Sequence, residues 1–99
     1  MTLHFDNTFT DVLPADPISE NSVRQVKEAC YSYVSPKATK TPKIIHSSKD
    51  VAFQLGLSEV DIASLDFVKV FTGNLVLEQT APYAMCYGGH QFGNWAGQL

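Results

Sequence analysis

The sequence predicts an α+β fold made of short strands and two or three short helices. Alternating apolar residues, or adjacent β-branched ones, indicate strands in residues 29–34 and 43–46. Serines that precede apolar helical stripes, with glycines after them, indicate helices that begin near residues 48 and 58. A length of 99 residues, with 44% hydrophobic and 17% charged residues, is typical of one small globular domain.

The first 28 residues are predicted to form an N-terminal arm. Pro14 and Pro17 interrupt regular structure, so residues 1–22 are expected to be an extended arm or loop, with a helical turn from Ser19 as an option. The main domain would then lie in residues 29–99.

A short strand is predicted from Ala29 to Val34, where small or polar residues alternate with aromatic and apolar ones. Pro36 ends this run, which favours a position at the edge of a sheet. Residues 35–42 form a basic, proline-bounded connector. For the lysines between Lys37 and Lys49, a solvated loop is a more common role than phosphate binding.

Residues 43–56 predict a strand, a tight turn and a short helix in succession. Lys43–His46 contains adjacent β-branched residues and is predicted to be a strand. Ser47 or Ser48 would cap the helix, because a serine hydroxyl accepts a hydrogen bond from a free N–H of the first turn. Gly56 suits the left-handed position that ends a helix. The apolar stripe and the first-turn carboxylate would be Val51, Ala52, Leu55 and Asp50.

A second helix is predicted to begin after Ser58, because Asp61 stands three residues later, as in a capping box. A third is predicted within residues 66–74, where Gly73 closes an apolar run. A strand is the alternative for this run, since Val and Phe suit both structures. Residues 75–82 then form a connector.

Residues 83–99 contain no Asp, Glu, Lys or Arg. Tyr83–Tyr87 is predicted to be a buried strand that leads into the stretch GGHQFGNWAGQL. Closely spaced glycines let backbone N–H groups approach a phosphate, but the common phosphate-binding loops add a lysine that is absent here. The alternative, more common on residue chemistry alone, is a strand pair that packs Phe92 and Trp95 into a core, with His90 buried and hydrogen-bonded.

Other chemistries have less support in the sequence. Cys30 and Cys86 lack the spacing of metal ligands and are expected to be reduced thiols. To bind a metal, His90 would need partners, and His4 and His46 stand in unrelated contexts. A Cys86 nucleophile with His90 as its base would lack a third, orienting group.

Charge and hydropathy limit the partners. The net charge of −3 gives no reason to expect nucleic acid, although Lys and Arg concentrate in residues 24–49. No apolar run approaches the roughly 18–20 residues that span a bilayer, and the first residues lack the pattern of a signal or transit peptide. The sequence therefore predicts a soluble, cytoplasmic protein without nucleic-acid or membrane partners.

The end of the chain closely resembles a signature of the selenoprotein O family (SelO, called YdiU in bacteria). The stretch PYAMCYGGHQFGNWAGQL matches the family pattern Y-x-G-H-Q-F-G-x-W-A-G-Q-L, which continues in that family with G-D-G-R-A. Upstream, FDNTF, LPADP and ACYSYVSPKATKTPKIIHSSKDVAFQLGLS also resemble the family's N-terminal region. The matching positions of the signature are Tyr87, Gly89, His90, Gln91, Phe92, Gly93, Trp95, Ala96, Gly97, Gln98 and Leu99.

The resemblance implies a protein of several hundred residues with a protein-kinase-like (pseudokinase) fold, in which residues 29–99 form part of the N-lobe. It implies transfer of AMP from ATP to Ser, Thr or Tyr hydroxyls of proteins, with Mg²⁺ or Mn²⁺. The family's catalytic, metal-binding and established ATP-contacting residues would lie beyond Leu99, so none is expected in this chain. The residues that would shape the nucleotide loop are Gly89, His90, Gln91, Gly93 and Gly97.

The resemblance also implies that the glycine-rich end is an interior motif of a longer chain. The 99 residues alone are expected to be inactive, to hold neither ATP nor metal, and to self-associate through open sheet edges. One alternative is a non-catalytic interaction or scaffold module that uses the aromatic, glycine-rich segment. Another is a pseudoenzyme that binds a nucleotide without transferring it.

Overall fold

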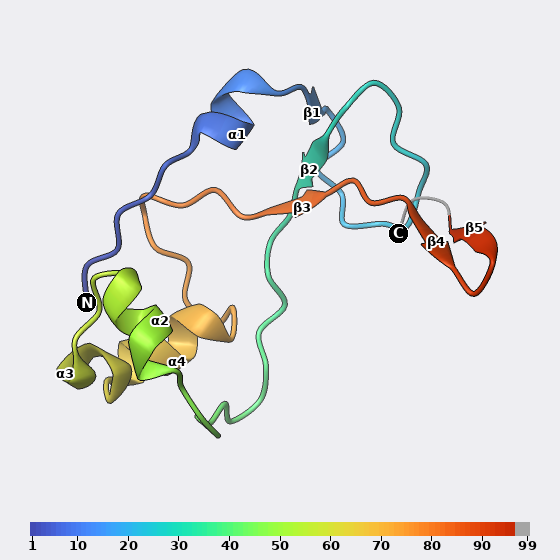
Figure 1. Cartoon of the computed structure of the whole chain (residues 1–99). Coiled ribbons are helices and arrows are strands. Elements are labelled where there is room, and N and C mark those ends of the chain that lie inside the picture. The colour runs from blue at the N-terminus through green and yellow to red at the C-terminus, as the bar shows by residue number, and fades with distance from the viewer. Residues whose placement is uncertain (97–99) are drawn as a thin grey trace. The chain divides into compact units, whose positions relative to one another are not determined.

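A computed structural model describes residues 1–96 as short helices and strands joined by long connections (Figure 1). The contacts divide the chain into two compact units. The helical unit comprises residues 1–5 and 36–80, and the sheet unit comprises residues 6–35 and the chain from residue 81 onward. The predicted α+β class is confirmed. Within the described residues, none of the helices has the length and apolar character needed to cross a membrane.

The first helix of the helical unit, α2, spans Lys49–Gln54 and begins at a predicted cap. The N–H of Val51 donates to the hydroxyl oxygen of Ser48 over 3.4 Å. Gly56 has a φ of 77° and ends the helix in the left-handed conformation, as predicted. Of the expected apolar stripe, only Ala52 is buried, and its other two members are about half exposed.

The next two helices, α3 (Glu59–Ile62) and α4 (Leu65–Phe71), follow at once and contact each other. The N–H of Ser58 donates to Asp61 Oδ2 over 2.9 Å, and the N–H of Asp61 donates to Ser58 Oγ over 3.2 Å. The predicted capping box is therefore confirmed. Gly73, with a φ of 75°, follows α4, so helix rather than strand is correct for this segment.

The strand predicted at Lys43–His46 is wrong. These residues form no regular structure, and Ile45 is 99% exposed. β-branched residues favour a strand where a neighbouring strand and a packed face receive them, and this segment has neither.

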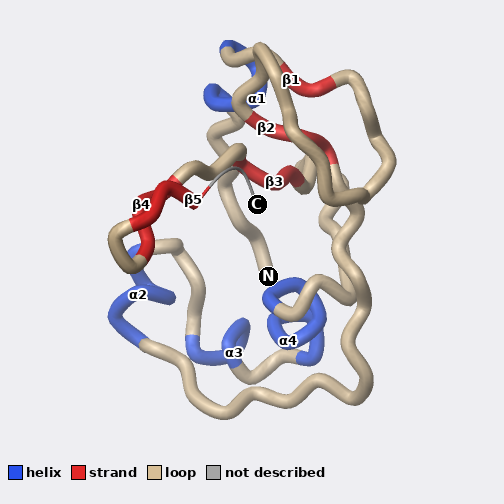
Figure 2. Tube along the Cα trace, turned by 90° about the vertical axis from the view of Figure 1, so that its right-hand side faces the viewer, coloured by secondary structure: helices blue, strands red, loops and turns tan. Residues whose placement is uncertain are grey.

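The sheet unit contains a mixed three-stranded sheet in the order β1–β2–β3 (Figure 2). β1 (Ala15–Asp16) is parallel to β2 (Tyr31–Tyr33), and β2 is antiparallel to β3 (Tyr83–Met85). The strand predicted at residues 29–34 is therefore shorter than expected and lies at the centre of the sheet. The edge position was wrong because β1 supplies a second neighbour.

Two elements lie where an irregular arm was expected. β1 is one, and the other is α1, which spans Thr8–Val12 and raises the number of helices in residues 1–96 to four. The expectation that residues 1–22 lack regular structure is wrong, and no helical turn forms at Ser19. The carboxylate of Asp6 accepts a hydrogen bond of 2.9 Å from the N–H of Thr8, which fixes the start of α1.

β3 was predicted to be a buried strand over Tyr83–Tyr87, and this is wrong in two respects. It ends at Met85, and all three of its residues are exposed. The reason is its position at the edge of the sheet, where β2 is its neighbour on one side.

One face of the sheet is aromatic. Tyr31 is 1% exposed, and its ring centroid lies 5.6 Å from that of Phe9 and 5.3 Å from those of Tyr33 and Tyr83. The Tyr31 hydroxyl donates to the carbonyl of Thr10 over 2.7 Å. Its hydrogen bond with the Tyr33 hydroxyl raises the pKa of Tyr31 to about 12. This cluster is the core of the sheet unit.

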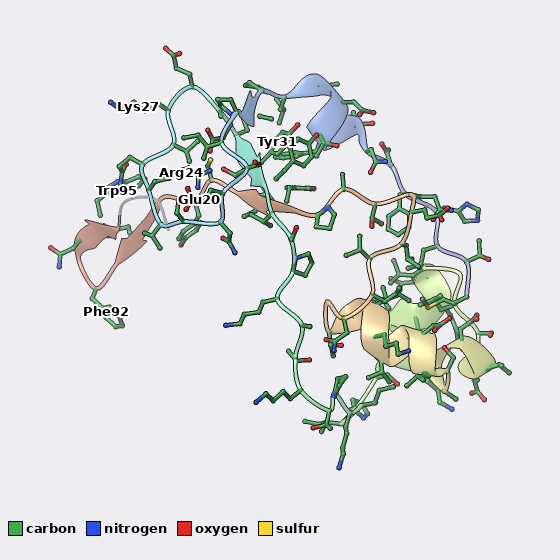
Figure 3. The ribbon with its side chains drawn as sticks, turned by 180° about the vertical axis from the view of Figure 1, so that it is seen from behind. Glu20, Arg24, Lys27, Tyr31, Phe92 and Trp95 are labelled. Carbon is green, nitrogen blue, oxygen red and sulfur yellow. The ribbon has the colours of Figure 1, made fainter. Side chains whose placement is uncertain are left out.

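The opposite face carries a charged cluster centred on Arg24 (Figure 3). Arg24 Nε donates to Asp16 Oδ2 over 3.1 Å, and Nη2 also contacts that carboxylate. Ser32 Oγ donates to the same oxygen over 3.0 Å, and Arg24 Nη1 donates to the carbonyl of Glu20 over 2.9 Å. The guanidinium hydrogen bond lowers the pKa of Asp16. Arg24 thereby ties the β1–β2 connection to both strands.

Candidate functional site

The glycine-rich end forms a β-hairpin. Its strands, β4 (Gly89–Gln91) and β5 (Asn94–Ala96), are antiparallel, and His90 lies opposite Trp95. Four of the five residues predicted to shape a nucleotide loop lie in this hairpin, and Gly97 lies outside the described residues.

The turn of the hairpin has an unusual residue at its tip. Phe92 and Gly93 have φ values of 48° and 82°, the left-handed pair that the common two-residue hairpin turns use. For a residue with a Cβ, this conformation costs roughly 1–2 kcal/mol. The Phe92 side chain is nevertheless fully exposed and points away from the hairpin (Figure 3). Its ring gains no packing that would offset the strain, which suggests a role outside the fold.

The two glycines before the turn lie close to neighbouring rings. A Cβ on Gly88 would lie 2.5 Å from the ring of Trp95, and a Cβ on Gly89 would overlap the phenol of Tyr87. Both contacts are with the outer ends of exposed side chains, so a larger residue at either position would displace a ring and not the backbone. The glycines allow these two rings to lie against the backbone of the segment.

The alternative arrangement of a strand pair with a packed aromatic core is half confirmed. The strands pair as it required, but Trp95 is 71% exposed and Phe92 lies fully in solvent. His90 is also exposed. The burial was wrong because, in the part of the chain that the structure describes, no second layer covers this two-stranded ribbon.

The hairpin offers no charge to a nucleotide. Binding of phosphates and their metal needs cations and carboxylates, and residues 83–96 contain neither. Within residues 1–96, no group of three His, Cys, Asp or Glu side chains is arranged to hold a metal, and no hydrogen bond joins Cys86 to His90. Residues 83–96 therefore do not fit the charged part of metal-bound ATP. What they offer is ring faces and backbone N–H groups.

Two features of the sheet unit were not predicted. The left-handed conformation of Phe92 had a weak signal in the sequence, because a residue followed by glycine between two short strands can form a two-residue turn. The signal was weak because the first residue of such a turn is usually Asn or Asp. The cluster of Asp16, Arg24 and Ser32 had none, because its members come from separate segments.

Comparison with known proteins identifies the class. The chain is 53% identical over 97 residues to a protein nucleotidyltransferase YdiU from Flavobacterium johnsoniae, covering 98% of this chain and 19% of that protein. It is 54% identical over 97 residues to the protein of that name from Azoarcus sp. (strain BH72), with the same coverage. It is 48% identical over 97 residues to the protein of that name from Rhodopirellula baltica, and the match covers 98% of this chain and 18% of that protein. These relatives are nucleotidyltransferases by name.

The family follows from a second match. Residues 18–99 match the sequence model of the family described as protein adenylyltransferase SelO. The chain belongs to the SelO family, as the resemblance of its glycine-rich end indicated. It spans about a fifth of the length of the curated relatives it matches. No solved structure matches the chain.

Proposed function

We propose that this chain is the N-terminal segment of a protein adenylyltransferase, which transfers AMP from ATP to Ser, Thr or Tyr hydroxyls of other proteins. Membership of the SelO family over residues 18–99 is the observation that carries the proposal. The same proposal includes a kinase-like N-lobe in residues 29–99, an arm in residues 1–28 and a cytoplasmic location. It also includes ATP with Mg²⁺ or Mn²⁺ as cofactors of the whole enzyme, and proteins as its substrates.

Within this function, we assign the β4–β5 hairpin the role of a wall beside the nucleotide. The absence of Lys, Arg, Asp and Glu from residues 83–96 supports a wall rather than a phosphate cradle. Phosphate binding and the chemical step are therefore assigned to other residues of the enzyme, and the 99 residues alone should be inactive. The residues proposed to shape the wall are Gly89, His90, Gln91 and Gly93, and the fifth predicted residue, Gly97, lies outside the described residues.

The test uses the longer enzyme that contains these residues, and two matched glycine substitutions. Gly93 in the hairpin and Gly56 after α2 have φ values of 82° and 77°, and a Cβ at either would meet nothing within 4 Å. Gly93→Val and Gly56→Val therefore impose the same kind of backbone strain, and the added Cβ meets no neighbouring atom at either position. Only Gly93→Val distorts the proposed wall.

We expect Gly93→Val to lower transfer of labelled AMP from ATP to a protein acceptor by roughly 10²-fold, since small misplacements near reacting groups have effects of this size. Gly56→Val should leave transfer near the wild-type level in preparations that are equally folded. Equal losses in both variants, or none in Gly93→Val, would contradict the assignment. Calorimetry of the 99-residue chain with Mg-ATP is a separate check, and micromolar binding would overturn its expected inactivity.

A non-catalytic interaction module is the second candidate, and exposed rings on the hairpin favour it. Phe92 is fully exposed, Trp95 is 71% exposed and Tyr87 is 50% exposed. In this case Phe92→Ser would abolish binding of a partner protein, while Ile45→Ser, at a 99% exposed position of the helical unit, would not. Label transfer by the longer protein would argue against this candidate.

Self-association through an open sheet edge is proposed for the 99-residue chain. The support is the position of β3, whose outer edge has no partner strand in residues 1–96. Solution scattering should show dimers that dissociate on dilution. A compact monomer at high protein concentration would contradict this.

A further inference from the structure

The antiparallel register of β2 and β3 brings the two cysteines together. Tyr31 pairs with Met85, and Ser32 pairs with Ala84. One step further along the same register, Cys30 lies opposite Cys86. The N–H of Cys86 donates to the carbonyl oxygen of Cys30 over 2.9 Å, so one hydrogen bond continues the register just beyond the strands, while the N–H of Cys30 donates to the carbonyl oxygen of Pro14.

Residues that face each other across antiparallel strands project to the same side of the sheet. Facing residues of antiparallel strands have Cα atoms about 4.5–5.5 Å apart. Disulfides span Cα separations of about 4.4–6.8 Å. Cys30 and Cys86 can therefore be bridged without a large movement of the backbone.

Both thiols can be reached from solvent. Each cysteine is free and only partly buried. Cys86 also lines a cavity of about 200 Å³, whose other walls include Ser32, Ala84 and residues 21–24. A small oxidant can enter such a space, which Cys86 lines together with Met85.

The register also indicates that a bridge would be reversible. Cβ atoms of facing residues in antiparallel strands lie about 4.5–5.5 Å apart, whereas disulfides prefer about 3.5–4.5 Å. A bond made at this position would carry strain. Strained and accessible disulfides are the ones that are readily reduced again.

We propose that Cys30 and Cys86 form a reversible oxidation site, at which a peroxide converts the two thiols to an intramolecular disulfide. The Cys86 thiolate attacks one peroxide oxygen, so the O–O bond breaks, a sulfenic acid forms and hydroxide leaves. The Cys30 thiolate then attacks that sulfur, so an S–S bond forms, the S–O bond breaks and a second hydroxide leaves. The two protons lost by the thiols convert the two hydroxides to water. The sulfurs give up two electrons and the peroxide is reduced.

The site stands where the sheet leads into the hairpin. Cys86 follows the last residue of β3, and two residues after it, Tyr87 and Gly88, lead to β4. The bridge would hold the start of this connection to β2 covalently. This inference does not depend on the proposed transferase activity, because it rests on the register and the thiols alone.

The test oxidises the dilute 99-residue chain with hydrogen peroxide and maps the products by mass spectrometry without reduction. Trypsin cuts after Lys27, Lys37 and Lys69, so the cysteines fall in the peptides 28–37 and 70–99. We expect these two peptides to be joined, with the loss of two hydrogen atoms, and to separate again on treatment with dithiothreitol. Titration of free thiols should show that both are consumed together.

A register-shifted variant is the matched control. Met85→Cys combined with Cys86→Ala moves the second thiol by one residue, to the other face of the strand. Met85 is 59% exposed, so this change should be tolerated. We expect no 28–37 to 70–99 bridge in this variant. The proposal is overturned if the wild-type thiols remain free, if they yield only sulfinic acids or intermolecular disulfides, or if the control forms the bridge equally well.

Discussion

The helical unit and the sheet unit are held together by different kinds of contact. In the helical unit, the caps at Ser48 and Ser58 join residues three positions apart. In the sheet unit, β2 pairs with a strand far along the chain, and Arg24 joins Asp16 to the loop between β1 and β2. The helix ends of one unit depend on local bonds, although Asn74 in that unit also bonds to Thr39 over 35 positions. The sheet of the other unit depends on pairing between strands that are far apart in the sequence.

The difference in contacts between the two units predicts how much of each unit a single substitution should destabilise. Among the side chains that the structure describes, each unit has one that is large and fully buried: Leu57 at 2% exposure in the helical unit and Tyr31 at 1% in the sheet unit. Loss of a cap should loosen one helix end, whereas loss of the Arg24–Asp16 contact should free the segment between β1 and β2 that it holds. Substitutions in the two units therefore test whether they respond separately, and a buried apolar residue should give the largest effect.

Leu57→Ala should destabilise the helical unit by about 2–5 kcal/mol, because it removes buried methyl groups and leaves a cavity. Urea unfolding followed by amide hydrogen exchange checks this. Protection should be lost in α2, α3 and α4, while the amides of β2 keep theirs. Loss of protection in both units together would show that they unfold as one, and the comparison between them would fail.

Arg24→Gln should release the segment between β1 and β2, seen as faster hydrogen exchange at Ser32 at neutral pH. The wild type should also be sensitive to acid. Arg24 lowers the pKa of Asp16 in the folded state, so this contribution to stability is present above the unfolded pKa of about 3.9 and is lost as the pH falls below it. The variant should lack most of this acid sensitivity.

The control for this clamp is Lys27→Gln, which removes a nearby cation from an exposed position. It should retain both the protection of Ser32 and the acid sensitivity of the wild type. If Lys27→Gln and Arg24→Gln behaved alike, the general loss of positive charge would explain the result, and the clamp would not.

Phe92→Asn should stabilise the hairpin by about 1 kcal/mol, because Asn tolerates the left-handed conformation and Asn-Gly is the favoured sequence for such turns. Cross-strand contacts between His90 and Trp95, followed by nuclear magnetic resonance on heating, measure this. In the helical unit, Phe53→Asn should have the opposite sign, since Asn is a poorer helix former than most residues. A hairpin that melts earlier in the Phe92→Asn variant than in the wild type would refute the strain argument.

Lys49→Met should have the smallest effect. The Lys49 ammonium lies 2.7 Å from the carboxylate of Glu59, but both side chains are about two-thirds exposed. This contact lowers the pKa of Glu59, so its small contribution is present above the unfolded pKa of about 4.3 and disappears below it. The urea midpoints of variant and wild type should coincide at acidic pH and at high salt. A shift comparable with that of Arg24→Gln would contradict the ranking.

The helical unit could be predicted from the sequence because its signals are local. Ser48 and Ser58 cap helices through bonds to residues three positions away, and Gly56 and Gly73 end them through their own backbone conformation. The hydrogen bond from the N–H of Thr8 to Asp6 at the start of α1 is also local. The nearby Pro14 and Pro17 favoured an irregular arm, so α1 was not predicted.

The sheet unit could be predicted less well because strands depend on partners. Lys43–His46 has good strand residues and no partner, whereas β1 has only two residues and is a strand because Tyr31 and Ser32 lie beside it. The hairpin was anticipated as one alternative, but the exposure of its rings was not. An apolar side chain of a strand is buried only where another helix or sheet packs on it. The sequence of the hairpin does not show whether such an element is present.

One property of the hairpin follows from the rarity of its indole. Trp95 is the only tryptophan among 99 residues, and its ring lies against Gly88. Fluorescence excited at the red edge of the absorption band therefore arises from the hairpin alone. The glycine-rich segment carries its own optical probe, so its response to a nucleotide, a partner or an oxidant can be followed in solution without a label.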